Sequence, residues 1–191
     1  MAQHLTSGGI RLDSAIGRPS TDGETLTQVF VDPPAEGWNS GSAESLEPLA
    51  RKFDVAKRDA RNRELGRAGE EFVVAVERDR LTKLGLINEA SKVTWVSRDQ
   101  GDGLGYDVLS FAEDSTQLFI EVKTTHADID APFYITERER AVSARKGASY
   151  RLYRVFRFSR KPQIYVLRGP LEDTLRLKPA AYRATVRTPE G

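Results

Sequence analysis

The chain has 191 residues, with 29 Lys or Arg, 28 Asp or Glu, two His and no Cys. This length fits one domain with an additional tail, and the lack of cysteine excludes disulfides and thiolate metal sites. No apolar run reaches the roughly 18 residues of a membrane helix, and the first thirty residues lack the apolar block of a secretory signal, so we expect a cytoplasmic protein without a membrane partner.

Charge is segregated along the chain, although the net charge is only +1. Residues 101–137 hold eight acidic residues and one base, Lys123, whereas residues 138–191 hold fourteen basic and four acidic residues. This order suits a site that gathers carboxylates beside a surface that attracts an anion. Acidic loops and an Arg-covered surface without any site would give the same pattern, and charge alone leaves both interpretations open.

Residues 1–47 are predicted to be a flexible acidic tail, and residues 48–191 the folded domain. Gly, Ser, Thr, Pro, Asp and Glu dominate the tail, so it has too little apolar surface to offset the entropy lost on ordering. We therefore expect residues 1–40 to pack little. One short apolar alternation, Thr27 to Val31, could add an edge strand.

Two helices are predicted next, a weakly amphipathic one over 45–62 and a stronger one over 62–84. At 100° per residue Glu70 and Glu77 point to the same side of the second helix, whereas Glu71 points toward water. Glu70 then lies at the border of the buried face, where an unpaired carboxylate is costly. Its partner could be a neighbouring arginine or the chemistry of a site.

The hydrophobic period changes to two after residue 92, which indicates strands. Predicted strands with short connections form an antiparallel meander, and a helix that begins with a Thr136–Glu139 capping box precedes two further strands. The predicted ranges are 92–97, 106–111 and 118–124 for the meander, 136–146 for the helix, and 150–158 and 162–169 for the last strands. This order predicts an α/β sandwich in which a central mixed β-sheet is flanked by helices.

The meander carries the residues best suited to chemistry. Asp107 opens one strand, and Glu121 and Lys123 share one face of the next because side chains alternate along a strand. Two converging carboxylates ionise together only at a cost unless a cation neutralises them, and Mg²⁺ is the hard ion that prefers such oxygens. Lys123 could orient or deprotonate a water or stabilise charge on a phosphate, and Glu70 could complete the shell. A surface Glu/Lys pair on a strand is the alternative.

Asp107, Glu121-Val122-Lys123 and the helix of Glu70 are together similar to the PD-(D/E)XK nuclease superfamily. Over roughly residues 60–187 the chain resembles the NO VEIN C-terminal-like domain family through the segments GRAGEEFVVAVE, GLGYDVLSF, FIEVKTT, FYITERE and YRLYRVF. The Pro of the superfamily name is absent, because Tyr106 precedes Asp107.

The resemblance implies a restriction-endonuclease-like fold with a catalytic site. In this interpretation Asp107, Glu121 and Glu70 are ligands of Mg²⁺ or Mn²⁺, and Lys123 is the catalytic lysine. The family pattern also includes Glu77, Thr124 and Glu139, which we expect to support the site.

The function implied by the resemblance is a Mg²⁺-dependent nuclease acting on DNA, in a restriction, defence or helicase-associated setting with a matching protein partner. Basic residues on the predicted helix 136–146 and the strand after it are expected to follow the phosphates. These are Arg138, Arg145, Lys146, Arg151 and Arg154. Two alternatives stay open, namely a catalytically silent interaction module of a larger complex and an RNA-processing nuclease. The oligomeric state is not indicated.

Overall fold

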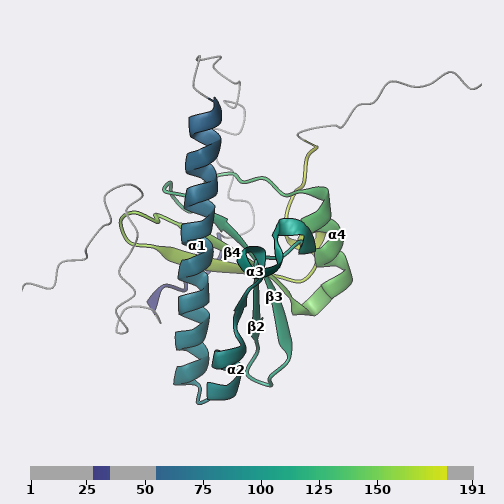
Figure 1. The fold of residues 1–191 in the computed structure, drawn as a ribbon. Helices are drawn as coiled ribbons and strands as arrows, with labels where there is room; N and C mark the ends of the chain where they lie inside the picture. Colours follow the sequence, from purple (N-terminus) through teal and green to yellow (C-terminus); the bar gives the residue numbers. More distant parts are fainter. Residues whose placement is uncertain (1–27, 35–54, 180–191) are drawn as a thin grey trace, which may run out of the picture.

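The computed structural model describes residues 28–34 and 55–179, which form one five-stranded sheet with helices on both faces (Figure 1). The strand order is β1-β2-β3-β4-β5; β3 and β4 run parallel, and the other neighbouring pairs are antiparallel. The strands are β1 (Thr94–Trp95), β2 (Val108–Phe111), β3 (Gln117–Thr124), β4 (Tyr150–Phe156) and β5 (Gln163–Arg168). The predicted mixed sheet with flanking helices is thus confirmed.

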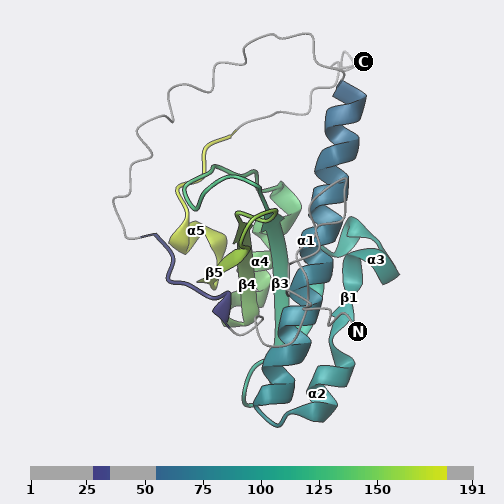
Figure 2. The same ribbon diagram turned by 90° about the vertical axis from the view of Figure 1, so that its left-hand side faces the viewer.

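Helix α1 (Val55–Lys83) crosses one face of this sheet as a single continuous helix (Figures 1 and 2). The predicted boundary at residue 62 is wrong, because the glycines near it are tolerated within the helix and no proline interrupts it. The helix ends before Gly85, whose φ of 79° is one that L side chains rarely adopt. Residues 45–54 of the first predicted helix lie outside the described residues.

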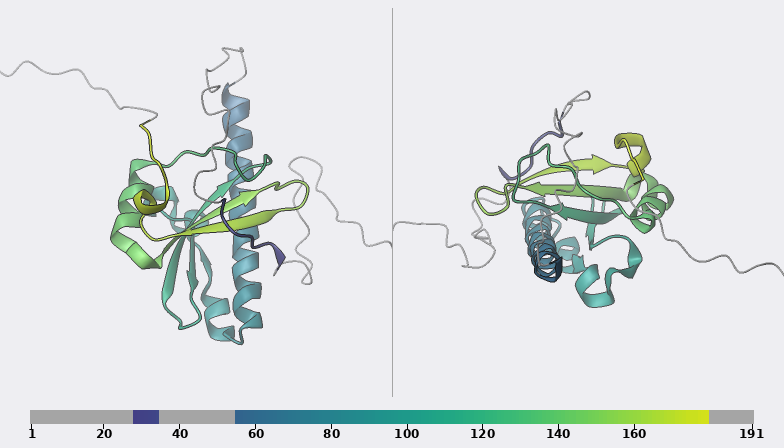
Figure 3. Two further views of the ribbon diagram at one scale, coloured as in Figure 1. Left: turned by 180° about the vertical axis from the view of Figure 1, so that it is seen from behind. Right: turned by 90° about the horizontal axis from the view of Figure 1, so that it is seen from above.

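The side chains of β3 alternate between two different environments. Ile120 and Val122 belong to the larger core, which they share with α1, whereas Phe119 packs with the smaller core beneath α4 (Glu137–Lys146) and α5 (Leu171–Thr174). Seen from above, α1 and the α4–α5 pair occupy different sides of the strands (Figure 3). Because alternation is strict, Glu121 and Lys123 share the side of Phe119 and face α4.

Short helices replace two of the predicted features. The predicted strand 92–97 is only Thr94–Trp95, and helix α3 (Val96–Gln100) and the 3₁₀ turn η3 (Asp102–Leu104) occupy the connection between the first two predicted strands. The reason is local, since the amides of Val96 and Ser97 both donate to the carbonyl of Asp107, at 2.8 and 3.2 Å, and this ends the β1–β2 ladder. Helices α2 (Ile87–Lys92) and α5 were not predicted.

The segment 28–34 packs on the edge of the sheet. Phe30 forms a parallel bridge with Ile164 of β5, the Ile164 amide donates to the Val29 carbonyl at 2.7 Å, and the Val29 side chain is only 5 % exposed. The Phe30 ring also meets the Tyr153 ring edge-on at 5.8 Å. The expectation that residues 1–40 pack little is therefore wrong at Val29 and Phe30. The edge strand that the sequence suggested is reduced to one bridge. The rest of the predicted tail lies outside the described residues.

A buried carboxylate fixes α1 to the sheet. Glu77 is fully buried and accepts hydrogen bonds from Arg80 at 3.0 and 2.7 Å, from the Ser110 hydroxyl at 2.6 Å and from the Tyr153 hydroxyl at 2.9 Å. These partners come from α1, β2 and β4. A buried charge with such a shell is tolerated, whereas removal of a partner would leave it uncompensated. Glu77 thus belongs to the framework that holds α1 on the sheet.

Helix α1 packs tightly against the sheet at Gly69. A Cβ atom there would lie 1.8 Å from the Thr124 hydroxyl oxygen, which is buried without a hydrogen-bond partner. We predict that Gly69→Ala lowers the free energy of unfolding by about 3 kcal/mol, because this overpacking displaces the helix from β3. Urea denaturation measures the change.

Gly66→Ala is the matched control, because a Cβ at Gly66 meets only Glu70 Oε1 at 3.9 Å. This variant should gain up to about 1 kcal/mol through higher helix propensity. Equal stability of the two variants would contradict the close packing inferred at Gly69.

Candidate active site

Asp107 closes the ladder between β2 and β3. It directly precedes Val108, which pairs with Ile120, so Asp107 lies across from Glu121. Its amide donates to the Ile120 carbonyl at 2.8 Å, and its Oδ2 accepts the Val122 amide at 2.8 Å. The side chain thus substitutes for a backbone acceptor, which fixes the carboxylate beside the middle of β3.

Lys123 is held between two carboxylates. Its Nζ lies 2.8 Å from Glu121 Oε1 and 2.8 Å from Glu139 Oε2. Glu139 also forms the capping box of α4, since its carboxylate accepts the Thr136 amide at 3.1 Å and its own amide donates to Thr136 Oγ1 at 3.2 Å. The predicted capping box is confirmed, and it orients a carboxylate toward the lysine.

Glu70 approaches from α1. Its Oε2 accepts a hydrogen bond from Trp95 Nε1 at 2.7 Å and another from the Ser97 hydroxyl, and the side chain is half-buried as its helical phase predicted. The described partners are therefore an indole and a hydroxyl rather than an arginine. Neither neutralises the carboxylate, so its charge acts on Asp107.

When ionised together, the carboxylates of the site carry more negative charge than Lys123 offsets, so their ionisation is opposed. Burial raises the pKa of Asp107 to about 7, and the negative charge of Glu70 raises it further. The hydrogen bond from the Val122 amide and the charge of Lys123 lower this pKa, but they do not outweigh burial. Burial, and then the charge of Asp107, raise the pKa of Glu121 as well. Burial alone would lower the pKa of Lys123, but Glu121 and Glu139 outweigh it and raise the pKa. A further cation would therefore stabilise the ionised site.

The fit of this site to a metal rests on two carboxylates. Among residues 28–34 and 55–179, no group of three or more His, Asp or Glu side chains is arranged to hold an ion. Asp107 and Glu121 nevertheless lie side by side, and Mg²⁺ takes one or two carboxylates together with waters. Hard oxygen donors with uncompensated charge fit such an ion. The structure thus brings together Asp107, Glu121 and Lys123, and it adds Glu139, while Glu70 contacts Trp95 and Ser97.

A family model described as Protein NO VEIN, C-terminal, matches residues 69–167 of the chain. The chain belongs to this family. The matched range begins at the close-packed Gly69 and contains Glu70, Asp107, Glu121 and Lys123. No curated protein and no solved structure shows significant similarity to the chain.

The basic residues predicted to bind nucleic acid do not form one surface of the NO VEIN C-terminal domain. Arg138, Arg145 and Lys146 are exposed on α4, and the Lys146 ammonium lies 3.6 Å from the centre of the Phe119 ring. Arg151 lines a groove on the α1 side of the sheet, with Arg80. Strand alternation separates Arg151 from the surface of α4.

Arg154 is buried beneath the loop that precedes α4. It is 2 % exposed, and its guanidinium donates to the carbonyls of Lys123 and Ala131 at 3.1 and 3.0 Å. A side chain so placed is out of reach of a phosphate. Our expectation that Arg154 contacts nucleic acid is therefore corrected: it holds the end of β3 to the loop.

Sequence reasoning missed several residues of the site. Tyr150 donates to the Gly105 carbonyl at 3.3 Å, and burial, with the charges of Glu121, Glu139 and Asp107, raises its pKa. The indole of Trp95 is the other unexpected contact. The parallel register of β3 and β4 places Tyr150 beside the carboxylates, and no sequence pattern gives that register.

Within the described residues, no helix is long and apolar enough to span a membrane.

The raised pKa of Asp107 predicts a pH-dependent stability of the metal-free protein. Since the folded-state pKa lies above the ordinary value near 4, the folded state binds a proton more tightly between about pH 4 and 7. This carboxyl's contribution to the free energy of unfolding therefore falls as pH rises through that window.

Asp107→Asn removes this titration while it keeps an acceptor for the Val122 amide. We expect the variant to exceed the wild type in stability at pH 8 by on the order of a few kcal/mol, and to gain little at pH 4. Denaturation in EDTA at both pH values measures this. The exposed Asp130→Asn variant is the control. A difference that does not change with pH would contradict the assignment.

Proposed function

We propose that this protein is a Mg²⁺-dependent nuclease of the PD-(D/E)XK type that hydrolyses phosphodiester bonds in DNA. The observation that supports the proposal is the side-by-side placement of Asp107, Glu121 and Lys123 at the β2–β3 pair, where burial raises the pKa values of both carboxyls. That arrangement is costly in a merely structural role, because two adjacent buried carboxylates oppose ionisation of each other.

Asp107 and Glu121 are the proposed ligands of Mg²⁺ or Mn²⁺. An ion held there supplies Lewis-acid stabilisation of phosphate charge and lowers the pKa of a bound water. The chain supplies the rigidity, since the Val122 amide fixes Asp107 and Lys123 fixes Glu121. Glu70 is proposed as an outer member of this set that acts through a water, because its Oε2 is already engaged by Trp95 and Ser97.

Lys123 acts in this proposal as a fixed positive charge rather than as a base. Its raised pKa keeps the ammonium protonated at neutral pH. An ammonium has three donors, and Glu121 and Glu139 take two, so one remains for a phosphate oxygen. A preorganised cation offsets the charge that develops on the phosphate in the transition state. Glu139 is a positioning residue, because it acts through Lys123.

The exposed bases of α4 are the proposed contact for the DNA backbone. Arg138, Arg145 and Lys146 lie on the helix whose first turn carries Glu139, so this basic surface adjoins the proposed metal site. Phosphate contacts of this kind position a strand without reading its sequence. A restriction, defence or helicase-associated role in the cytoplasm, with a matching protein partner, is part of the proposal and rests on the family resemblance.

The proposal predicts that Glu121 is needed for both metal binding and cleavage, whereas Lys123 is needed for cleavage alone. Glu121→Gln should weaken Mn²⁺ affinity in calorimetry by at least about 10-fold and abolish cleavage, because it removes a charged ligand. Lys123→Met should leave Mn²⁺ bound and lower the cleavage rate by about 100-fold, because it removes only charge stabilisation. Single- and double-stranded DNA and RNA are the substrates.

Glu137→Gln is the matched control, since this glutamate is exposed on α4 and pairs with Arg140 rather than with Lys123. It should keep both affinity and rate. Cleavage that is unchanged in Glu121→Gln would overturn the assignment of the site.

A catalytically silent interaction module is the second candidate. It is favoured by one observation, that the described residues contain no group of three or more metal-binding side chains. Such a module has no need of an ion at Asp107 and Glu121. Absence of Mn²⁺ binding by the intact protein would support the module and overturn the nuclease.

A further inference from the structure

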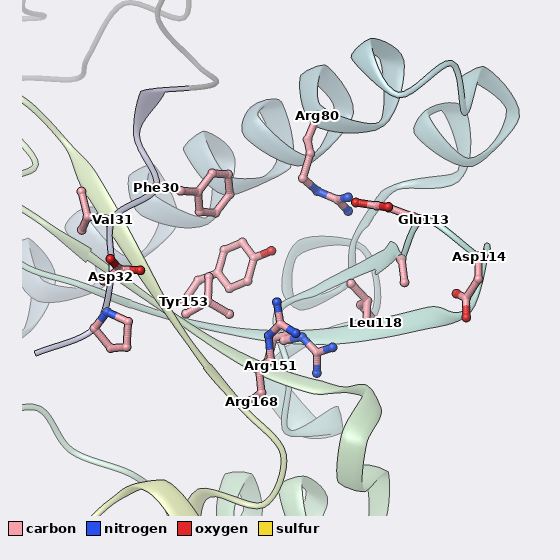
Figure 4. Close-up of a pocket in the computed structure, with 13 residues that line it drawn as sticks. Phe30, Val31, Asp32, Arg80, Glu113, Asp114, Leu118, Arg151, Tyr153 and Arg168 are labelled. Carbon is pink, nitrogen blue, oxygen red and sulfur yellow. The ribbon is translucent and has the colours of Figure 1, made fainter. Parts of the chain in front are cut away.

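A groove of about 760 Å³ opens on the α1 side of the sheet (Figure 4). Its walls come from the segment 30–33, the β2–β3 turn, the beginning of β4 and the end of β5. The residues that matter here are Phe30, Arg80, Leu118, Arg151, Tyr153 and Arg168. Leu118 stands near the start of β3, whereas Lys123 stands near its end and on the opposite face.

Two arginines meet in the middle of this groove. Arg151 of β4 is the direct register partner of Arg168 of β5, and Figure 4 shows their guanidinium groups side by side. Like charges directly opposite each other destabilise a strand pair. Within the described part of the chain neither arginine forms an ion pair with a carboxylate, so no direct ion pair offsets this repulsion there.

The donors of Arg151 are only partly used. Its Nη1 donates to the carbonyls of Ala148 and Tyr150, at 2.6 and 2.8 Å, which anchors the side chain and leaves Nε and Nη2 available. Arg168 is exposed and has no described partner. Arg80 is different, because Glu77 already neutralises it. Arg151 and Arg168 are therefore the cations of the groove that have no carboxylate partner among the described residues.

The surroundings of the pair restrict what can bind. Asp32 and Asp114 stand at opposite ends of the groove, and the Glu113 carboxylate stands near Arg80, all away from the two guanidinium groups (Figure 4). Carboxylates at both ends oppose a continuous polyanion that would run through the groove. Phe30 and Leu118 add apolar surface beside the pair. A single compact anion attached to an organic group fits this pattern of charge.

We propose that the Arg151–Arg168 pair binds a phosphomonoester, carried by a free nucleotide or by the 5′ end of a nucleic-acid strand. A terminal phosphate carries nearly two negative charges at neutral pH, which match two guanidinium groups, and its oxygens suit their forked donors. An internal phosphodiester carries only one charge. The site uses none of the residues proposed to hold the metal, so it stands apart from the nuclease proposal.

The test is calorimetry with the full chain in EDTA, so that no metal-dependent chemistry contributes. The probes are AMP, adenosine, and a tetranucleotide with either a 5′-phosphate or a 5′-hydroxyl. AMP or the phosphorylated strand should bind at least 10-fold more tightly than its counterpart without the phosphate. Tighter binding of the phosphorylated strand than of AMP assigns the strand end, and the reverse assigns the nucleotide.

Arg151→Gln and Arg168→Gln should each weaken this binding by at least 10-fold. The matched control is Arg160→Gln, an exposed arginine in the β4–β5 turn at the other end of the same strand pair, which should bind like the wild type. Arg168→Gln should also raise the melting temperature of the ligand-free protein, because it removes the like-charge contact. A raised melting temperature also shows that this variant is folded. No binding of either phosphorylated probe, equal binding of the probes without phosphate, or equal loss in Arg160→Gln would overturn the proposal.

Discussion

The hydrogen bond from the Val122 amide to the Asp107 carboxylate is the contact on which the site depends. It replaces a rung of the β2–β3 ladder with a side chain, so the strand pair ends where Asp107 begins. The backbone carbonyl of the same residue accepts two amides from the start of α3 and turns the chain there. One residue thereby ends a ladder, starts a helix and fixes a buried carboxylate next to Glu121, and the raised pKa values follow from that placement.

The second constraint is the position of Lys123 between the sheet and α4. Its ammonium joins Glu121 of β3 to Glu139, which is also the reciprocal partner of Thr136 in the capping box. The cap therefore couples the entry angle of a helix to the orientation of a lysine on a strand. A lysine held in this way loses rotamer freedom before any ligand arrives, which is the preorganisation that electrostatic stabilisation requires.

The sheet separates a cluster of carboxylates on one face from a pair of arginines on the other. On the α4 face, near the end of β3, carboxylates outnumber bases and suit a cation. On the α1 face, near the start of β3, Arg151 and Arg168 oppose each other without a carboxylate partner in the described chain and suit an anion. The acidic segment before residue 137 and the basic segment after it thus contribute to both faces, because alternation along the strands sends neighbouring side chains to opposite sides.

Local patterns in the sequence determined much of the architecture and part of the site. The period of two predicted β2 to β5, the Thr136–Glu139 spacing predicted the cap of α4, and strand alternation placed Glu121 and Lys123 on one face, as the structure shows. Helical phase likewise gave the half-buried position of Glu70. These features depend on neighbouring residues alone, so the sequence contains all that they need.

Tertiary structure decided the rest, because the partners are distant in the sequence. The pairing of Trp95 with Glu70, the burial of Arg154, the parallel register that brings Tyr150 to the carboxylates, and the docking of Val29 on β5 all join segments that no local period connects. The opposition of Arg151 and Arg168 likewise exists only through the β4–β5 register. The sequence by itself determined which side chains share a strand face or helix side, and only the packed sheet decided which of them meet.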